Sequence, residues 1–108
     1  MIAGGNLFSD VPVNLADEQF TELLSTAHVR IERIVSFGQA SPPGFWYDQD
    51  QAEWVILLTG SARLLFEGET AARQLQPGDY LRIPPHVRHR VEWTDDGRAT
   101  VWLAVHHC

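Results

Sequence analysis

The sequence predicts a small, mainly β domain, in which one short N-terminal helix precedes a closed barrel or sandwich of strands. Two observations carry this prediction. Short stretches of strand-like residues recur between residues 29 and 106, separated by turn-forming residues about every eight to twelve positions. The chain also has only 108 residues, which is enough for one hydrophobic core and too few for two.

The N-terminal part of the chain is predicted to be an extended arm followed by the helix. Residues 1–13 form the arm, whose apolar side chains are available to pack on another surface. Asn14 can cap a helix over residues 14–25, which has acidic residues in its first turn. Three apolar residues then recur at helical spacing: Phe20, Leu23 and Leu24.

The rest of the chain, residues 29–106, is predicted to form the barrel. Residues 29–37 alternate along the chain as a strand with two different faces does. Residues 54–58 are apolar throughout, so this strand should be covered on both faces. Further strands are predicted at 62–67, 71–75, 79–83, 89–94 and 99–106.

Composition narrows the class of protein. The formal net charge is −6, which argues against nucleic-acid binding, and the absence of lysine removes any Schiff-base mechanism. No signal-peptide pattern is visible and no apolar run is long enough to span a membrane. The single cysteine, Cys108, cannot form an internal disulfide, which favours a reducing compartment. We therefore expect a cytoplasmic protein without nucleic-acid or membrane partners.

The most informative stretch runs from Gly78 to His89. It contains a turn, a short strand, a proline-held turn and a histidine that opens another strand. This order can place one imidazole at the mouth of a barrel, where a metal ion could be held. About thirty residues upstream, the segment 45–53 offers the oxygen ligands that such a site would need.

On these residues the chain resembles a small single-domain cupin, and the resemblance covers the predicted barrel. The second cupin motif, G-x5-P-x-G-x2-H-x3-N, is met by Gly78, Pro84 and His89. His86 replaces its second glycine and Trp93 replaces its asparagine. The resemblance implies a double-stranded β-helix, or jelly-roll, barrel in which His89 is the metal-binding histidine.

The first cupin motif, G-x5-H-x-H-x3,4-E-x6-G, is only half present. It ends on Glu53 and Gly60 with the right spacing, but both of its histidines are missing. Other residues take the histidine positions: Tyr47 and Gln49 with the three-residue spacer, or Trp46 and Asp48 with the four-residue spacer. The resemblance therefore implies the fold and not the three-histidine metal site.

Strand alternation and the resemblance together give a candidate metal site. If Gln49, Glu53 and His89 face inward, they offer an amide oxygen, a carboxylate and an imidazole, which suit a divalent ion such as Mn, Fe, Ni or Zn. Asp48 is the next candidate ligand, because a carboxylate is a better anionic donor than an amide. The alternative is a metal-free His89 that is simply hydrogen-bonded to a carboxylate such as Glu53.

Two residues could assist the chemistry, and two further histidines are expected outside the site. Tyr47 is expected in the pocket wall, and Tyr47 or His86 could assist proton transfer, although for His86 we favour an exposed position in the loop. His106 and His107 are neighbours in the last strand, so their side chains point in opposite directions. We expect both of them at the surface.

Three kinds of function remain open. The first is a cupin that binds a divalent metal and a small ligand, with or without enzymatic action on a small acid, sugar or phenolic compound. The second is a non-catalytic binding or sensor module without metal, and the third is a structural partner protein. We also expect a homodimer, because the resemblance implies pairing and because three apolar residues opposite Glu53 need cover: Trp54, Ile56 and Leu58.

Overall fold

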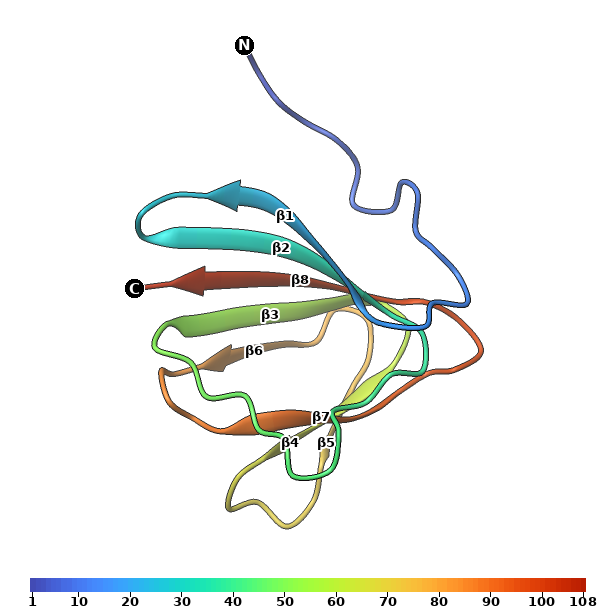
Figure 1. Ribbon diagram of the computed structural model, residues 1–108, viewed down its shortest axis with the longest axis vertical. Helices are drawn as coiled ribbons and strands as arrows, with labels where there is room; N and C mark the ends of the chain where they lie inside the picture. Colours follow the sequence, from blue (N-terminus) through green and yellow to red (C-terminus); the bar gives the residue numbers. More distant parts are fainter.

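The computed structural model describes all residues, 1–108, as eight strands without a helix (Figure 1). The strands are β1 (Gln19–Ser25), β2 (Val29–Ser36), β3 (Ala52–Thr59), β4 (Ala62–Phe66), β5 (Arg73–Leu75), β6 (Tyr80–Ile83), β7 (His89–Thr94) and β8 (Thr100–His107). They form a five-stranded antiparallel sheet, in the order β1-β2-β8-β3-β6, and a three-stranded one, in the order β5-β4-β7. The predicted all-β barrel is confirmed. The structure holds no helix that could cross a membrane.

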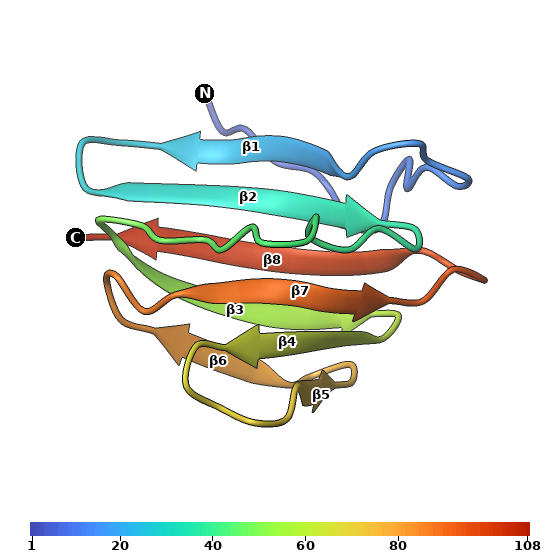
Figure 2. The same cartoon turned by 60° about the horizontal axis from the view of Figure 1, so that its bottom comes forward.

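The two sheets form the walls of the barrel, and the hydrophobic core lies between them. In Figure 1 the larger sheet runs from β1 at the top towards β6, with the smaller sheet below it, and Figure 2 shows β7 and β4 in front of β3. Nine buried residues form the core: Val55, Leu57, Ala62, Leu64, Phe66, Leu75, Ile83, Trp102 and Ala104. Burial of each large apolar side chain stabilises the fold by about 1.5–3 kcal/mol, so this cluster is the main source of stability.

The turn from β3 to β4 carries the chain from one sheet to the other. Gly60 lies in this turn with a φ of +88°, a conformation that other residues rarely adopt. A Cβ atom at Gly60 would lie 2.5 Å from the Cα atom of Thr100. Glycine is therefore required here both by the backbone conformation and by the close approach of β8.

The predicted helix over residues 14–25 is wrong. Residues Gln19–Ser25 instead form β1, the edge strand that pairs with β2 and carries a β-bulge between Glu22 and Leu24. The bulge adds one residue to the strand and breaks its two-residue alternation, which explains why the apolar spacing looked helical. Asn14, the predicted cap, has a φ of +55° and begins no helix. Pairing with β2 outweighs the weak local helix propensity of this segment.

The N-terminal arm, residues 1–13, is held to the outer face of the larger sheet by one arginine. The guanidinium of Arg33 donates to the carbonyl oxygens of Leu7 and Ser9 at 3.2 and 2.8 Å. Figure 1 shows the N-terminus extending away from the sheets. On the same outer face the ring of Trp54 lies 5.6 Å from that of the exposed Tyr80. The homodimer expected over this apolar face stays a prediction.

The segment between β2 and β3 positions part of the site, and we call residues 45–51 the strap. Tyr47 in the strap forms an isolated antiparallel bridge with His89 at the start of β7, through backbone hydrogen bonds of 2.7 and 3.1 Å. The backbone N–H of His86 donates to the carbonyl of Gln49 at 2.8 Å. The strap therefore lies along β7, and alternate side chains of the strap face the barrel interior.

Candidate functional site

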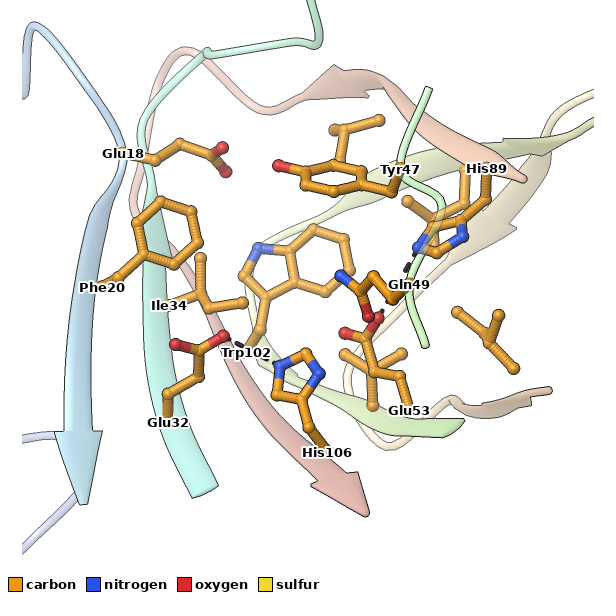
Figure 3. A pocket seen from close by; sticks show the side chains of 14 residues that line it. Glu18, Phe20, Glu32, Ile34, Tyr47, Gln49, Glu53, His89, Trp102 and His106 are labelled. Atoms are coloured by element: carbon orange, nitrogen blue, oxygen red, sulfur yellow. Dashed lines mark hydrogen bonds and ion pairs between the residues drawn. The ribbon is translucent and has the colours of Figure 1, made fainter. Parts of the chain in front are cut away.

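A pocket opens between the two sheets, next to the strap (Figure 3). Its cavity volume is about 70 Å³, and all the space out to its open mouth amounts to about 540 Å³. Fourteen residues line it: Glu18, Phe20, Glu32, Ile34, Tyr47, Gln49, Glu53, Val55, Leu64, Ile83, His89, Val91, Trp102 and His106. The lining combines an apolar wall with a group of ionisable side chains.

Four ionisable side chains form a row across the pocket, which we call the acid–base row. The order of the strands brings Glu32 from β2, His106 from β8 and Glu53 from β3 side by side, and His89 from β7 faces Glu53 (Figure 3). Nε2 of His106 lies 3.0 Å from Oε1 of Glu32, and Nε2 of His89 lies 3.6 Å from Oε1 of Glu53. All four residues are buried, with 3–8% of their surface exposed. Carboxylates and imidazoles alternate along the row.

His89 is fixed on both faces of its ring and at both nitrogens. The ring of Tyr47 stacks on it with centroids 5.5 Å apart, and the ring of Phe66 lies at 5.8 Å. Nδ1 lies 2.9 Å from the carbonyl oxygen of Val87, which can only accept, so Nδ1 carries a hydrogen. Burial works against the charged imidazolium, but Glu53 and the Val87 carbonyl favour it more strongly, so the pKa of His89 is raised above its usual value. This imidazole is arranged to hold a proton in the pocket.

A second set of polar groups lies at the opposite side of the pocket, around Glu18. Its carboxylate accepts a short hydrogen bond from the Ser36 hydroxyl, which in turn accepts one from Nε1 of Trp102 at 3.2 Å. Burial raises the pKa of Glu18, and the Ser36 hydrogen bond opposes this only in part. Figure 3 shows the Tyr47 hydroxyl directed towards Glu18. Burial raises the pKa of Tyr47, as do the charges of nearby carboxylates, first among them Glu18, so the phenol stays neutral.

The structure brings four of the predicted site residues into the pocket and leaves two outside. Tyr47, Gln49, Glu53 and His89 all line it. Because alternate residues of the strap face inward, Asp48 points away from the pocket between Tyr47 and Gln49. The three-residue spacer of the first cupin motif is therefore the one that describes this chain, and Asp48 is not placed to share an ion with His89.

His86 is the other predicted residue outside the pocket. Its side chain is 62% exposed, and its Nδ1 lies 2.7 Å from the carboxylate of Asp48 while its Nε2 lies 3.3 Å from that of Asp50. His86 has a φ of +62°, in keeping with its position where the family motif has glycine. It clamps the strap to the turn before β7, and it does not reach the pocket in which it was predicted to assist proton transfer.

Three pocket residues were missed in the sequence. The expectation that His106 lies at the surface is wrong, because it is 3% exposed and faces the pocket, with His107 on the opposite face of β8. The signal was present, since His106 follows Trp102 and Ala104 at two-residue spacing on one face of the strand. Glu18 and Glu32 carried no comparable signal, because an isolated glutamate is usually a solvated residue.

Cupins commonly hold a divalent metal, so the side chains of the pocket have to be considered as ligands for such an ion. An ion next to His89 would find one imidazole, one carboxylate from Glu53 and the weaker amide of Gln49, while Nε2 of His106 is held by Glu32 at 3.0 Å. The Tyr47 hydroxyl is directed away towards Glu18, and no group of three or more His, Cys, Asp or Glu side chains is placed to hold an ion. Resident transition-metal sites in proteins use at least three strong donors, which these residues do not supply.

Comparison with known proteins agrees with this architecture. Residues 35–106 match the model of the cupin domain family, whereas no curated protein matches the chain. A crystal structure of a proposed mannose-6-phosphate isomerase from Ralstonia eutropha shares 58% sequence identity, with 98% of each chain covered and a TM-score of 0.96. A cupin superfamily protein from Desulfitobacterium hafniense shares the fold at 16% identity, with 90% of this chain and 83% of that chain covered and a TM-score of 0.73. The chain belongs to the cupin family.

Proposed function

We propose that the protein binds a neutral, hydroxyl-bearing small molecule, such as a monosaccharide or a phenol, in the pocket between its sheets. One observation carries the proposal: three glutamates and two histidines line the pocket, but none of the eight arginines of the chain does. A phosphate or carboxylate group in this pocket would face carboxylates without a guanidinium or ammonium partner. Burial of an unpaired charge is strongly unfavourable, so an anionic ligand does not suit the site.

The same reasoning disfavours a cationic ligand, because each carboxylate is already compensated. Glu32 is paired with Nη1 of Arg30 at 3.0 Å, and Glu53 faces His89 at 3.6 Å. Burial raises the pKa of Glu18 and so favours its neutral form. The pocket therefore offers hydrogen-bond donors and acceptors without a large uncompensated charge, which suits hydroxyl groups.

The apolar wall supports a ring-shaped ligand. Trp102 from β8 and Ile34 from β2 lie together on one side of the pocket, with Val55 and Leu64 also in the lining. An aromatic ring or the C–H face of a sugar can pack against such a wall while its hydroxyl groups reach the acid–base row. This division of the lining is typical of sites that orient a small ligand with a few polar contacts.

The similar protein from Ralstonia eutropha supports part of this proposal. Its description as a proposed mannose-6-phosphate isomerase names a sugar, whose hydroxyl groups suit the pocket of this chain. The phosphate of such a substrate is the part that this pocket does not accommodate. We therefore expect a neutral sugar to bind more tightly here than its phosphorylated form.

Isothermal calorimetry with matched neutral and anionic ligands tests the proposal. D-mannose would be compared with D-mannose 6-phosphate, and catechol with benzoate. The neutral member of at least one pair should bind at least about tenfold more tightly than its anionic partner. Binding should weaken in the variant Glu53→Gln and persist in Glu67→Gln, which makes the same change at an exposed residue outside the pocket. Tighter binding of both anions would refute the proposal.

A metal-dependent function is tested separately, because it predicts a different result. Titration with Mn²⁺, Fe²⁺, Ni²⁺ and Zn²⁺ should show no stoichiometric site that depends on His89. A site with one ion per chain that disappears in His89→Ala would show that His89, Glu53 and Gln49 hold a metal after all. The ligand would then bind beside an ion, and the proposal that the pocket works without a metal would be wrong.

A further inference from the structure

His106 is a second buried imidazole in the pocket that ligand binding alone leaves without a role. In the register of β3 and β8, His106 lies directly opposite Glu53. Residues in such pairs have Cβ atoms about 4.5–5.5 Å apart. The carboxylate of Glu53 therefore has an imidazole on either side, with His89 across the barrel at 3.6 Å and His106 on the neighbouring strand.

The two imidazoles are held in complementary ways. Nε2 of His106 faces the Glu32 carboxylate at 3.0 Å, so in the neutral ring Nε2 carries the hydrogen and Nδ1 keeps a lone pair. No hydrogen bond to Nδ1 of His106 is formed by the protein. In His89 the two ring nitrogens have the opposite arrangement, because the Nδ1 hydrogen faces the Val87 carbonyl and Nε2 faces the Glu53 carboxylate. His106 is thus arranged as a base, and His89 beside Glu53 as a proton donor.

We propose that His106 is a second acid–base residue of the pocket, positioned by Glu32, and that with His89 it moves a proton between adjacent carbons of a bound hydroxy-carbonyl compound. The open-chain form of a neutral aldose or ketose is such a compound. The inference rests on the proposed function, since it requires that a neutral ligand enters this pocket. Both imidazoles and both carboxylates line the same cavity, so a ligand that enters it lies between the two sides.

The step balances without an oxidant or a reductant. Nδ1 of His106 takes the proton from the carbon that bears the hydroxyl group, and the C–H electron pair becomes the C=C bond of an enediol. The imidazolium of His89 gives its Nε2 proton to the carbonyl oxygen. In the second half His106 returns a proton to the former carbonyl carbon, and the neighbouring hydroxyl group gives its proton back to His89. The product is an isomer of the substrate, and both histidines regain their starting state.

Hydrogen exchange in D₂O tests this step separately from binding. Wild-type protein and variants would be incubated with D-mannose, and loss of the C2 proton signal followed by NMR, while calorimetry measures binding. His106→Gln keeps a donor for Glu32 but cannot take up a proton. His107→Gln is the matched control, because His107 lies on the opposite face of the same strand. Melting curves confirm that each variant is folded.

We expect His106→Gln to slow C2 exchange by about 100- to 10,000-fold, the usual range for loss of an acid–base group, with affinity within about threefold of wild type. His89→Gln should slow it similarly, and His107→Gln should not. Exchange at the wild-type rate in His106→Gln would assign His106 a structural role only. Binding of D-mannose without exchange by the wild type would overturn the inference and leave the proposed function standing. Absence of D-mannose binding in calorimetry would overturn the inference, and absence of catechol binding as well would reject the proposed function.

Discussion

The buried pair of Glu32 and His106 gives a sharp test of how the acid–base row affects stability. We consider Glu32→Leu, His106→Leu and the variant with both changes. The two side chains are 8% and 3% exposed, and their 3.0 Å contact is shielded from water. Removal of one partner of a buried pair leaves the other without compensation, whereas removal of both leaves an apolar surface.

The contacts give the size of each effect. Glu32→Leu leaves the N–H of His106 unpartnered, which destabilises the fold by about 1–3 kcal/mol. It also removes the ion pair with Arg30, whose side chain is 40% exposed, so this pair contributes only about 0–1 kcal/mol. His106→Leu removes a hydrogen bond to a charged group, a loss of about 1.5–3 kcal/mol, although Glu32 keeps Arg30. The double variant loses only the Arg30 pair and should lie within about 1 kcal/mol of wild type.

Urea denaturation at neutral pH measures the three free energies of unfolding. Without the Arg30 pair, which both Glu32→Leu and the double variant lose, the single effects sum to about 2.5–6 kcal/mol. The double variant should therefore be at least about 2.5 kcal/mol more stable than additivity predicts, near the upper end of the coupling of about 0.5–3 kcal/mol between groups in contact. It should also fail to catalyse C2 exchange. Additivity within about 0.5 kcal/mol would mean that the two side chains do not depend on each other, and the reasoning about the row would be refuted.

Three further predictions concern pH and the fold. Burial raises the pKa of Glu18 above its ordinary value of 4.5, so its contribution to stability is present below that pH and is lost as pH rises through the folded-state pKa. The variant Glu18→Gln should therefore become more stable relative to wild type as pH rises from 4 to 8, and urea midpoints that show no such gain would contradict this. Gly60→Ala places a Cβ atom at a positive φ and against the backbone of β8, so it should lower the free energy of unfolding more than Gly78→Ala, where φ is +94° but nothing lies within 4 Å. Equal decreases of the two variants in urea denaturation would contradict the argument from close approach. Leu57 is 0% exposed in the core, so Leu57→Ala should lower the free energy of unfolding by about 2–5 kcal/mol, whereas Leu23→Ala, at a residue that is 48% exposed, should lower it by less than about 0.5 kcal/mol. Equal shifts of the two melting temperatures would contradict the assigned core.

The barrel could be predicted because its strands follow simple rules. The strand expected at 89–94 coincides with β7, and the turn signals around Gly60 and Gly78 fall between strands as expected. The segment before β2 could not be predicted in the same way. Its local pattern allows either a helix or a bulged strand, and only the free edge of β2, a non-local feature, decides between them.

The site was predictable only in part, for a similar reason. The family motif pointed to His89 and Glu53, and both lie in the pocket. Whether Tyr47 or Asp48 faces inward depends on the single bridge between the strap and β7, which leaves no trace in the sequence. His106 had a usable signal in its spacing from Trp102, but its place beside another histidine at the end of the last strand favoured a surface position.

The interior of the barrel contains an apolar cluster and a pocket with ionisable side chains. Towards β4, β5 and β6 the interior is filled by the apolar cluster that includes Leu57, Leu64 and Leu75. In the pocket, carboxylates and imidazoles from β2, β3, β7 and β8 join the apolar lining, and their burial stabilises the fold no better than apolar side chains of similar size would. A purely structural interior would therefore have no need of the acid–base row. Because the apolar cluster supplies the stability, the pocket can hold desolvated ionisable groups at fixed positions. Proton transfer to a bound ligand requires groups that are held in this way.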